Sequence, residues 1–342
     1  MKRLREFDVL KGLSITAVIL IHVTSHGVGT FDPTSTSYFV YLILNRLSQF
    51  AVPTFIFTSC VLLSYIHGDG FRSMTTEKLK TFYRKRFVRI IPPYLIWTLV
   101  YLVVKHIESN GTVLVTLGNY FNLLLKGDGY YHLYFVIVIL QVYIFLPFIM
   151  YVMSHLSIKF HYVLLCSVGI QVACYYFYES YLIHYFPRGT RLMIWYLVFV
   201  LMGVWIGINY ETYCKKDRYI TAFVPIAIVS GISYTYLYHL SNISQHVPLG
   251  RLNLVWYIYV SSMPLLLLYI SKKVNSRFFE TAGQLSFGIF LMHPLFLFIM
   301  NRMYATANAI LYDIFVFFII YSLSYILTKW LEATPWGKYI VG

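Results

Sequence analysis

Charged residues are scarce in this chain. Only 12% of the 342 residues are Asp, Glu, Lys or Arg, about half of the roughly 25% found in an average soluble domain. Hydrophobic residues make up 59% of the chain, and its mean hydropathy is +0.67. So few charges cannot cover a water-exposed surface, and lipid must be the main solvent. The composition therefore predicts an all-α polytopic membrane protein.

Cysteine is also scarce, and its spacing indicates no special chemistry. The four cysteines form neither a C-x-x-C pair nor a Cys/His metal pattern; they are Cys60, Cys166, Cys174 and Cys214. Three of them lie in apolar runs, where a thiol behaves as a small hydrophobic group. We expect neither a disulfide framework nor a bound metal.

Acidic residues are few relative to basic ones. The chain has 27 Lys and Arg against 13 Asp and Glu, which gives a net charge of +14. In a soluble protein this excess would suggest nucleic acid as a partner. Here the basic residues occupy short stretches between long apolar runs, so the expected anionic partner is membrane lipid, and no nucleic acid is expected.

The apolar runs set the number of predicted membrane spans. A span needs about 20 mostly apolar residues, and ten stretches qualify: 9–29, 38–66, 88–107, 131–153, 160–178, 192–210, 219–238, 253–271, 284–301 and 308–329. The apolar stretch 112–125 is too short and is expected to be interfacial or re-entrant.

Charge distribution supports this count. If residue 1 is cytoplasmic, 20 of the 27 lysines and arginines fall on the inner side and 6 on the outer side, as the positive-inside rule requires. The sequence thus predicts about ten transmembrane helices with both termini in the cytoplasm. The longest inner loop, 67–87, leaves no room for a further domain, so residues 1–342 are expected to form one membrane-embedded domain without a fused soluble part.

Two ionisable residues of the first predicted helix are candidates for chemistry. Lys11 and His22 are eleven residues apart, close to three full turns, so both lie on one helix face about 16 Å apart along the axis. Ionisable groups inside a bilayer are costly and are functional candidates by default. His22 suits a general base. The alternative is that Lys11 only anchors the helix and His22 only packs.

A basic cluster precedes the third predicted span. The sequence Arg84-Lys85-Arg86-Phe87-Val88-Arg89 runs directly into Ile-Ile-Pro-Pro-Tyr. On a helix, Arg86 and Arg89 are i,i+3 neighbours, and two adjacent guanidinium groups can hold a phosphate. The simpler reading is that this cluster only sets membrane topology.

These features together resemble the acyltransferase type 3 family of integral membrane acyltransferases. Lys11, ten intervening residues and His22 are similar to its first-helix signature, in which arginine is commoner than lysine. Arg86-x-x-Arg89 resembles its R-x-x-R motif. Two further segments resemble its later motifs: Tyr131-His132-Leu133-Tyr134-Phe135, with Tyr134 in place of tryptophan, and Ser286 to Pro294 including His293, with phenylalanine in both tyrosine positions.

The resemblance implies an enzyme that moves an acyl group across the bacterial cytoplasmic membrane. An acetyl or succinyl group would pass from cytoplasmic acyl-CoA, a co-substrate rather than a bound cofactor, to a hydroxyl of an extracytoplasmic polysaccharide or other surface glycan. Arg86 and Arg89 would hold the CoA phosphates. Lys11 would assist at the inner mouth, and His22 would act as general base or as acyl relay. Glycan synthase proteins are conceivable partners.

Three weaker candidates complete the predicted site. His132, with Tyr131 beside it, would support the substrate; the alternative is an aromatic belt at the membrane interface. His293 would also support the substrate, or would only bond the helix backbone next to Pro294. Asp313 in the last span could orient His22. These roles stay open at the level of sequence.

Two other functions compete with acyl transfer. The first is an exporter of a polysaccharide or a lipid-linked sugar, for which inverted repeats and paired broken helices would be expected; no internal repeat is evident. The second is a non-catalytic membrane subunit of a glycan synthase, which would need neither His22 nor the arginine pair.

Overall fold

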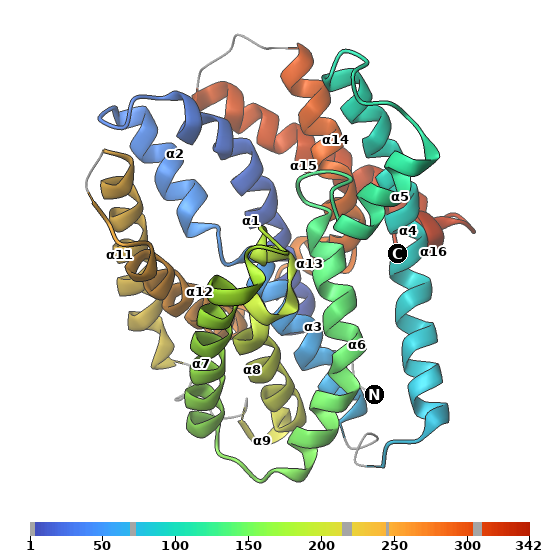
Figure 1. Ribbon diagram of the computed structural model, residues 1–342, viewed down its shortest axis with the longest axis vertical. Coiled ribbons are helices and arrows are strands. Elements are labelled where there is room, and N and C mark those ends of the chain that lie inside the picture. The colour runs from blue at the N-terminus through green and yellow to red at the C-terminus, as the bar shows by residue number, and fades with distance from the viewer. Residues whose placement is uncertain (1–3, 69–72, 214–220, 244–245, 304–309) are drawn as a thin grey trace. The chain divides into compact units, whose positions relative to one another are not determined.

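The computed structural model describes residues 4–68, 73–213, 221–243, 246–303 and 310–342. Within these ranges the chain is helical and contains no strand (Figure 1), which confirms the predicted all-α class. The chain divides into two compact units, and each is described by itself. The first comprises Met1–Thr58 and Lys215–Trp330, and the second comprises Ser59–Cys214 and Leu331–Gly342.

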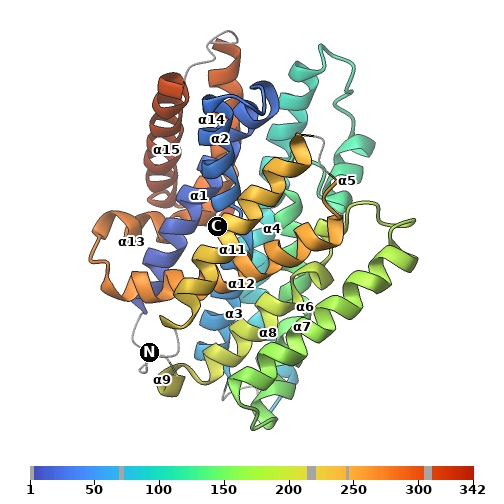
Figure 2. The same cartoon turned by 90° about the vertical axis from the view of Figure 1, so that its left-hand side faces the viewer.

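Helix α1 is the centre of the first unit. It packs against α2, α12, α13 and α14, while α11 pairs with α12 and also contacts α2; Figure 2 shows α13 beside α1. The helices of this unit are α1 (Arg5–Thr30), α2 (Thr36–Leu47), the start of α3 (Ala51–His67), α11 (Phe223–Asn242), α12 (Leu249–Lys273), α13 (Arg277–Gln284), α14 (Ser286–Met303) and α15 (Ile310–Glu332).

Two glycines allow α1 and α13 to approach closely. A Cβ atom on Gly12 would overlap the carbonyl group of Phe279, and one on Gly283 would overlap the carbonyl oxygen of Asp8. Backbone atoms cannot move aside as the end of a flexible side chain can, so only glycine fits at either position. An ion pair between Arg5 and Glu280, at 2.9 Å, also joins the two helices.

The second unit is built around α4 and α6. Helix α4 contacts α5, α6 and α16, and α6 contacts α8, which pairs with α7. The α-helices of this unit, besides the rest of α3, are α4 (Thr76–Glu108), α5 (Leu117–Lys126), α6 (Tyr134–His155), α7 (Phe160–Phe177), α8 (Leu197–Ile208), α9 (Tyr210–Tyr213) and α16 (Gly337–Ile340). Short π or 3-10 turns are η2 (Tyr178–Leu182), η3 (Gly189–Arg191) and η4 (Met193–Tyr196).

The described helices agree with most of the predicted spans. Among the residues that the structure describes, nine helical stretches are long and apolar enough to cross a membrane. The predicted span 192–210 corresponds instead to a shorter apolar stretch, Met193–Ile208. The predicted span 38–66 consists of α2 and α3, with a break between Leu47 and Ala51. The stretch 112–125 contains only the ten-residue helix α5, as its length predicted.

The predicted inner loop 67–87 is largely helical. Helix α4 begins at Thr76, whose preceding residue, Thr75, accepts a hydrogen bond from the backbone of Lys78. The helix continues through Pro92 and Pro93 to Glu108. The basic cluster 84–89 therefore lies within a 33-residue helix. Thr75 caps the start of this helix, and lysine and arginine are compatible with its continuation.

Candidate functional site

His22 of α1 meets His293 of α14 in the interior of the first unit. Their imidazole rings are stacked, with centroids 5.2 Å apart and an interplanar angle of 28°. His293 is 1% exposed, and both helices are apolar spans. Two sequence-predicted histidines, far apart in the chain, are thus brought together at one point of the membrane-spanning region.

The backbone next to Pro294 fixes the orientation of the His293 ring. Its Nδ1 lies 3.2 Å from the carbonyl oxygen of Ile289, one turn earlier. A carbonyl oxygen can only accept, so Nδ1 donates and carries the proton in the neutral ring. Both readings of His293 from the sequence therefore describe part of its environment: it bonds the backbone near a proline, and it also contacts His22.

Asn45 of α2 supports α1 directly beside His22. Its side-chain amide donates to the carbonyl oxygen of Ile21 at 2.8 Å and to the hydroxyl of Thr24 at 3.1 Å. Asn45 is 1% exposed, and buried amides of this kind are strongly held by their partners. Sequence reasoning missed this residue; the only signal was an amide inside an apolar span.

Lys11 lies on the same continuous helix as His22. Its ammonium group pairs with the carboxylate of Asp8 at 2.9 Å, and the Lys11 side chain is 23% exposed. Lys11 is thus held near the start of α1, eleven residues before His22. A role for Lys11 at the inner mouth stays a prediction.

Asp313 of α15 lies near α1 but bonds a different residue from the one predicted. The hydroxyl of Tyr41 donates to its carboxylate, and His26 is a further electrostatic neighbour. Asp313 and Tyr41 line a small apolar pocket of about 150 Å³ between α1, α2 and α15. The suggested role of Asp313 in orienting His22 stays a prediction.

In the second unit, Arg86 and Arg89 are one turn apart on α4, as predicted. Arg89 is exposed and Arg86 is half-buried. The Nε of Arg86 is buried and has no hydrogen-bond partner within the described part of the chain. Tyr143 of α6 and His67 at the end of α3 are its electrostatic neighbours. A buried guanidinium nitrogen that lacks an acceptor is costly, and an anion could supply one.

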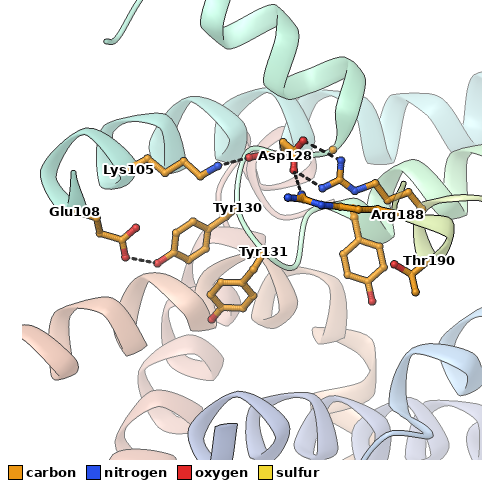
Figure 3. A pocket seen from close by; sticks show the side chains of 10 residues that line it. Lys105, Glu108, Asp128, Tyr130, Tyr131, Arg188 and Thr190 are labelled. Carbon is orange, nitrogen blue, oxygen red and sulfur yellow. Dashed lines mark hydrogen bonds and ion pairs between the residues drawn. The ribbon is translucent and has the colours of Figure 1, made fainter. Parts of the chain in front are cut away.

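The other end of α4 forms the wall of a pocket of about 670 Å³ (Figure 3). Lys105 is 19 residues beyond Arg86, which on an α-helix is a rise of about 28 Å, close to the thickness of the hydrocarbon core. The pocket and Arg86 are therefore separated along α4 by about the thickness of a hydrocarbon core. Its lining residues are Lys105, Glu108, Gly127, Asp128, Tyr130, Tyr131, Tyr134, Arg188, Thr190 and Arg191.

Tyr131 and His132, both predicted from the sequence, belong to this region. Tyr131 lines the pocket and is 46% exposed. His132 is 2% exposed and packs edge-on against Tyr101 at 5.1 Å and Tyr131 at 5.6 Å. Tyr131 can therefore contact a ligand, whereas His132 supports Tyr131 from behind.

Asp128 is the centre of the charged groups in the pocket. Its carboxylate pairs with Arg188, at 2.8 Å, and with both terminal nitrogens of Arg191. Lys105 donates to its backbone carbonyl. The hydrogen bond from Arg191 is the main reason why the pKa of the Asp128 carboxyl lies below its usual value. The sequence analysis assigned no role to Asp128 and missed this cluster.

Two tyrosines of the pocket stay protonated at neutral pH. Burial raises the pKa of Tyr130, and its hydrogen bond to Glu108, at 2.7 Å, raises it further. The pKa of Tyr131 is raised as well, mainly by desolvation from the protein atoms around it and further by Tyr130 and Glu108, although 46% of the residue surface is exposed. Both phenols therefore keep their O–H groups, and Tyr131 offers a ring face together with a hydroxyl donor.

Comparison with known proteins agrees with the motifs and the spans. A family model described as an acyltransferase domain (acyltransferase 3) matches residues 4–329. The chain belongs to the acyltransferase 3 family. This confirms the resemblance that its first-helix, arginine and histidine motifs indicated.

Curated relatives of this acyltransferase 3 protein include proteins of Staphylococcus aureus strains MRSA252, MSSA476 and MW2. Each is named "Probable poly-beta-1,6-N-acetyl-D-glucosamine export protein" and is 24% identical over 340 residues. The alignments cover 96% of this chain and 91% of each relative. No solved structure matches the chain.

Proposed function

We propose that this protein transfers a short acyl group, acetyl or succinyl, from cytoplasmic acyl-CoA to a hydroxyl of an extracytoplasmic polysaccharide. Membership of an acyltransferase family supports the reaction class. The observation that carries the proposal is the stacked pair of His22 and His293 inside apolar helices. An imidazole is the usual general base near neutral pH, and it has no evident structural need inside a membrane.

The arginines of α4 are the proposed donor site. Arg86 and Arg89 offer guanidinium groups on one helix face, and the Nε of Arg86 is buried without an acceptor in the described residues. Guanidinium groups bind phosphate oxygens in pairs, and CoA carries several phosphates. In this proposal His22 removes the proton of the accepting hydroxyl or relays the acyl group, and the CoA thiolate is the leaving group.

The test uses vesicles that separate donor from acceptor. Purified protein is reconstituted into liposomes loaded with an N-acetylglucosamine oligosaccharide, a glycan chosen from the name of the relatives, and labelled acetyl-CoA is added outside. We expect label to appear on the enclosed oligosaccharide. His22→Ala should lower the rate about 10²- to 10⁴-fold, the contribution of general base catalysis.

His161→Ala is the matched control, because His161 is an exposed histidine on α7 and should leave the rate unchanged. Equal rates in His22→Ala and wild type would overturn the proposal for His22. An absence of acyl transfer from both acetyl-CoA and succinyl-CoA would overturn the proposed reaction.

Export is the second candidate function, because the relatives are named as export proteins. The same vesicles distinguish it from acyl transfer. In these vesicles the lumen corresponds to the extracytoplasmic side, so an exporter would carry oligosaccharide added outside into the lumen without any acyl-CoA. No acyl label would then appear on the oligosaccharide with either wild type or His22→Ala. An acyltransferase would retain the oligosaccharide and acylate it inside.

A further inference from the structure

The pocket at the C-terminal end of α4 has the dimensions of a ligand site. Its volume of about 670 Å³ falls within the range of roughly 300–1,000 Å³ that small-molecule sites occupy. Three segments of the second unit form its walls: the end of α4, the loop 127–134 and the loop 188–191. Figure 3 shows side chains from these segments converging on one space.

The charged side chains of this pocket are already fixed by one another. Asp128 accepts hydrogen bonds from Arg188 and Arg191, and Glu108 accepts one from Tyr130. A ligand would therefore meet groups that are ordered before it binds, and little side-chain freedom would be lost on binding. Fixed groups of this kind distinguish a formed site from a flexible loop surface.

Aromatic rings supply the apolar part of the pocket. Tyr130 is 8% exposed and stacks on Tyr101 with centroids 4.6 Å apart, whereas Tyr131 next to it is 46% exposed. Tyr131 thus presents a supported ring with a hydroxyl at its edge. A sugar ring has the complementary character, since its C–H groups form an apolar face and its hydroxyl groups lie around the rim.

The charge of the pocket selects among sugars. Three cationic and two anionic side chains line it, and both carboxylates already accept hydrogen bonds from neighbouring side chains. The side chain of Arg188 is 66% exposed, so part of its guanidinium group is available to a ligand. Excess positive charge and occupied carboxylates disfavour an amine-bearing sugar and suit an uncharged or acidic one.

We propose that this pocket binds the acceptor glycan, as a short segment of uncharged or acidic sugar units that stacks on Tyr131 and accepts hydrogen bonds from Arg188. The inference rests on the proposed function, in which the Arg86 end of α4 faces the cytoplasm and the pocket faces the glycan. It adds the chemical class of the acceptor and the residues that hold it.

The experiment measures glycan binding without any acyl donor. Purified protein in nanodiscs is titrated with the N-acetylglucosamine oligosaccharide, with its de-N-acetylated cationic form and with an acidic oligosaccharide, and Kd is obtained by calorimetry. We expect the cationic form to bind most weakly. Tyr131→Ala and Arg188→Gln should each raise Kd about tenfold or more, the loss expected for one hydrogen bond to a charged group or one stacking contact.

Matched variants keep the result interpretable. Tyr185→Ala removes a tyrosine that is 80% exposed and does not line the pocket, and Arg251→Gln removes an exposed arginine at the start of α12. Both should leave Kd unchanged. Tyr131→Phe should bind nearly as wild type does, which separates a lost contact from misfolding.

The outcomes separate this inference from the proposed function. If Tyr131→Ala and Arg188→Gln weakened glycan binding but no acyl transfer were detected, the glycan site would be supported and the proposed reaction would be overturned. Acyl transfer with unchanged acceptor KM in both variants would keep the reaction and overturn the site. Failure of all three oligosaccharides to bind, or occupancy by phosphatidylglycerol alone, would also overturn it.

Discussion

The imidazole of His22 stacks on that of His293, with centroids 5.2 Å apart, and His293 in turn is oriented by the carbonyl oxygen of Ile289. The ring that we propose as base or relay is thus held by a second ring, which is itself held by its own helix. Stacking of this kind restricts the orientation of the His22 ring without a hydrogen bond between the two imidazoles.

Substitution of His293 tests whether it positions His22. We expect His293→Ala to lower kcat about 10- to 100-fold, because small misplacements of a reacting group are costly. His293→Phe retains a ring for stacking and should recover part of this loss. If His293 were only structural, the activity of each variant would fall only in proportion to the amount of folded protein. Steady-state kinetics measure kcat for both variants, at a temperature below the melting temperature of each. Equal kcat in His293→Ala and wild type would contradict the positioning role.

The arginine pair is tested by two changes together: the guanidinium groups are removed from the protein, and the phosphates are removed from the donor. Arg86→Gln and Arg89→Gln should each raise the KM for acetyl-CoA about tenfold or more, the cost of a hydrogen bond to a charged group. They should leave the KM for S-acetylpantetheine, which lacks the phosphates, unchanged. Arg84→Gln, at an exposed neighbour on the same helix, is the control. An equal loss with both donors would exclude phosphate binding.

The orientation of α4 is tested by labelling introduced cysteines in a background without native ones. Glu77→Cys precedes the arginine pair, and Lys126→Cys lies at the end of α5; both positions are exposed. In intact cells, a membrane-impermeant maleimide should label Lys126→Cys and leave Glu77→Cys unlabelled until the membrane is opened. The reverse pattern would contradict the inward direction of the basic cluster.

The ion pairs of Asp128 should make the stability of the protein dependent on pH in the acidic range. Its folded-state pKa lies below the ordinary value of 3.8, mainly because Arg191 donates to it, with Arg188 and Lys105 adding to the effect. The stabilisation is therefore complete above the unfolded-state pKa and is lost as the pH falls through the folded-state pKa. The contribution of Asp128 should change the melting temperature little between pH 8 and pH 5, and the melting temperature should decrease when the pH is lowered below 4.

Asp128→Asn measures the same interaction at neutral pH. The side chain is 27% exposed, and the loss of charge-assisted hydrogen bonds should cost about 1–3 kcal/mol. The variant should also lose the acid dependence that Asp128 contributes. If wild type and Asp128→Asn responded identically to acid, the ion pairs would not be the source of the effect.

The close approach of α1 and α13 predicts that Gly283, which lies at their contact, does not tolerate a methyl group. Gly283→Ala should reduce stability by about 1–3 kcal/mol or more, as overpacking does, because its Cβ would meet the backbone of Asp8. Gly169→Ala is the control, because no atom lies near its Cβ position. Thermal unfolding in detergent compares the two. A neutral Gly283→Ala would mean that the helices can separate at no cost.

The spans could be predicted from the sequence because the bilayer imposes length and hydropathy on each helix separately. Where other forces decide, the prediction was less accurate. The cluster 84–89 was assigned to a loop border, yet Thr75 starts a helix that carries it. The stretch 192–210 has the composition of a span, but Gly189–Tyr196 forms short turns that shorten it.

The candidate site was predictable only residue by residue. His22 and His293 each matched a motif, but their stacking depends on the packing of α1 against α14, which no local pattern encodes. The same holds for Asp128, which receives Arg188 and Arg191 from a loop about 60 residues later in the chain. Asp313 illustrates the opposite case, since its burial was anticipated and its bond to Tyr41 was not.

The length of α4 has a consequence for the environment in which the enzyme works. Its 33 residues correspond to about 50 Å, well beyond the roughly 30 Å of the hydrocarbon core. In the proposed inward orientation, a helix of this length would carry Arg86 and Arg89 to the level of the lipid phosphates, where inner-leaflet phospholipids would compete with acyl-CoA for the same guanidinium groups. The phospholipid composition of the host membrane would then affect how tightly the proposed donor binds.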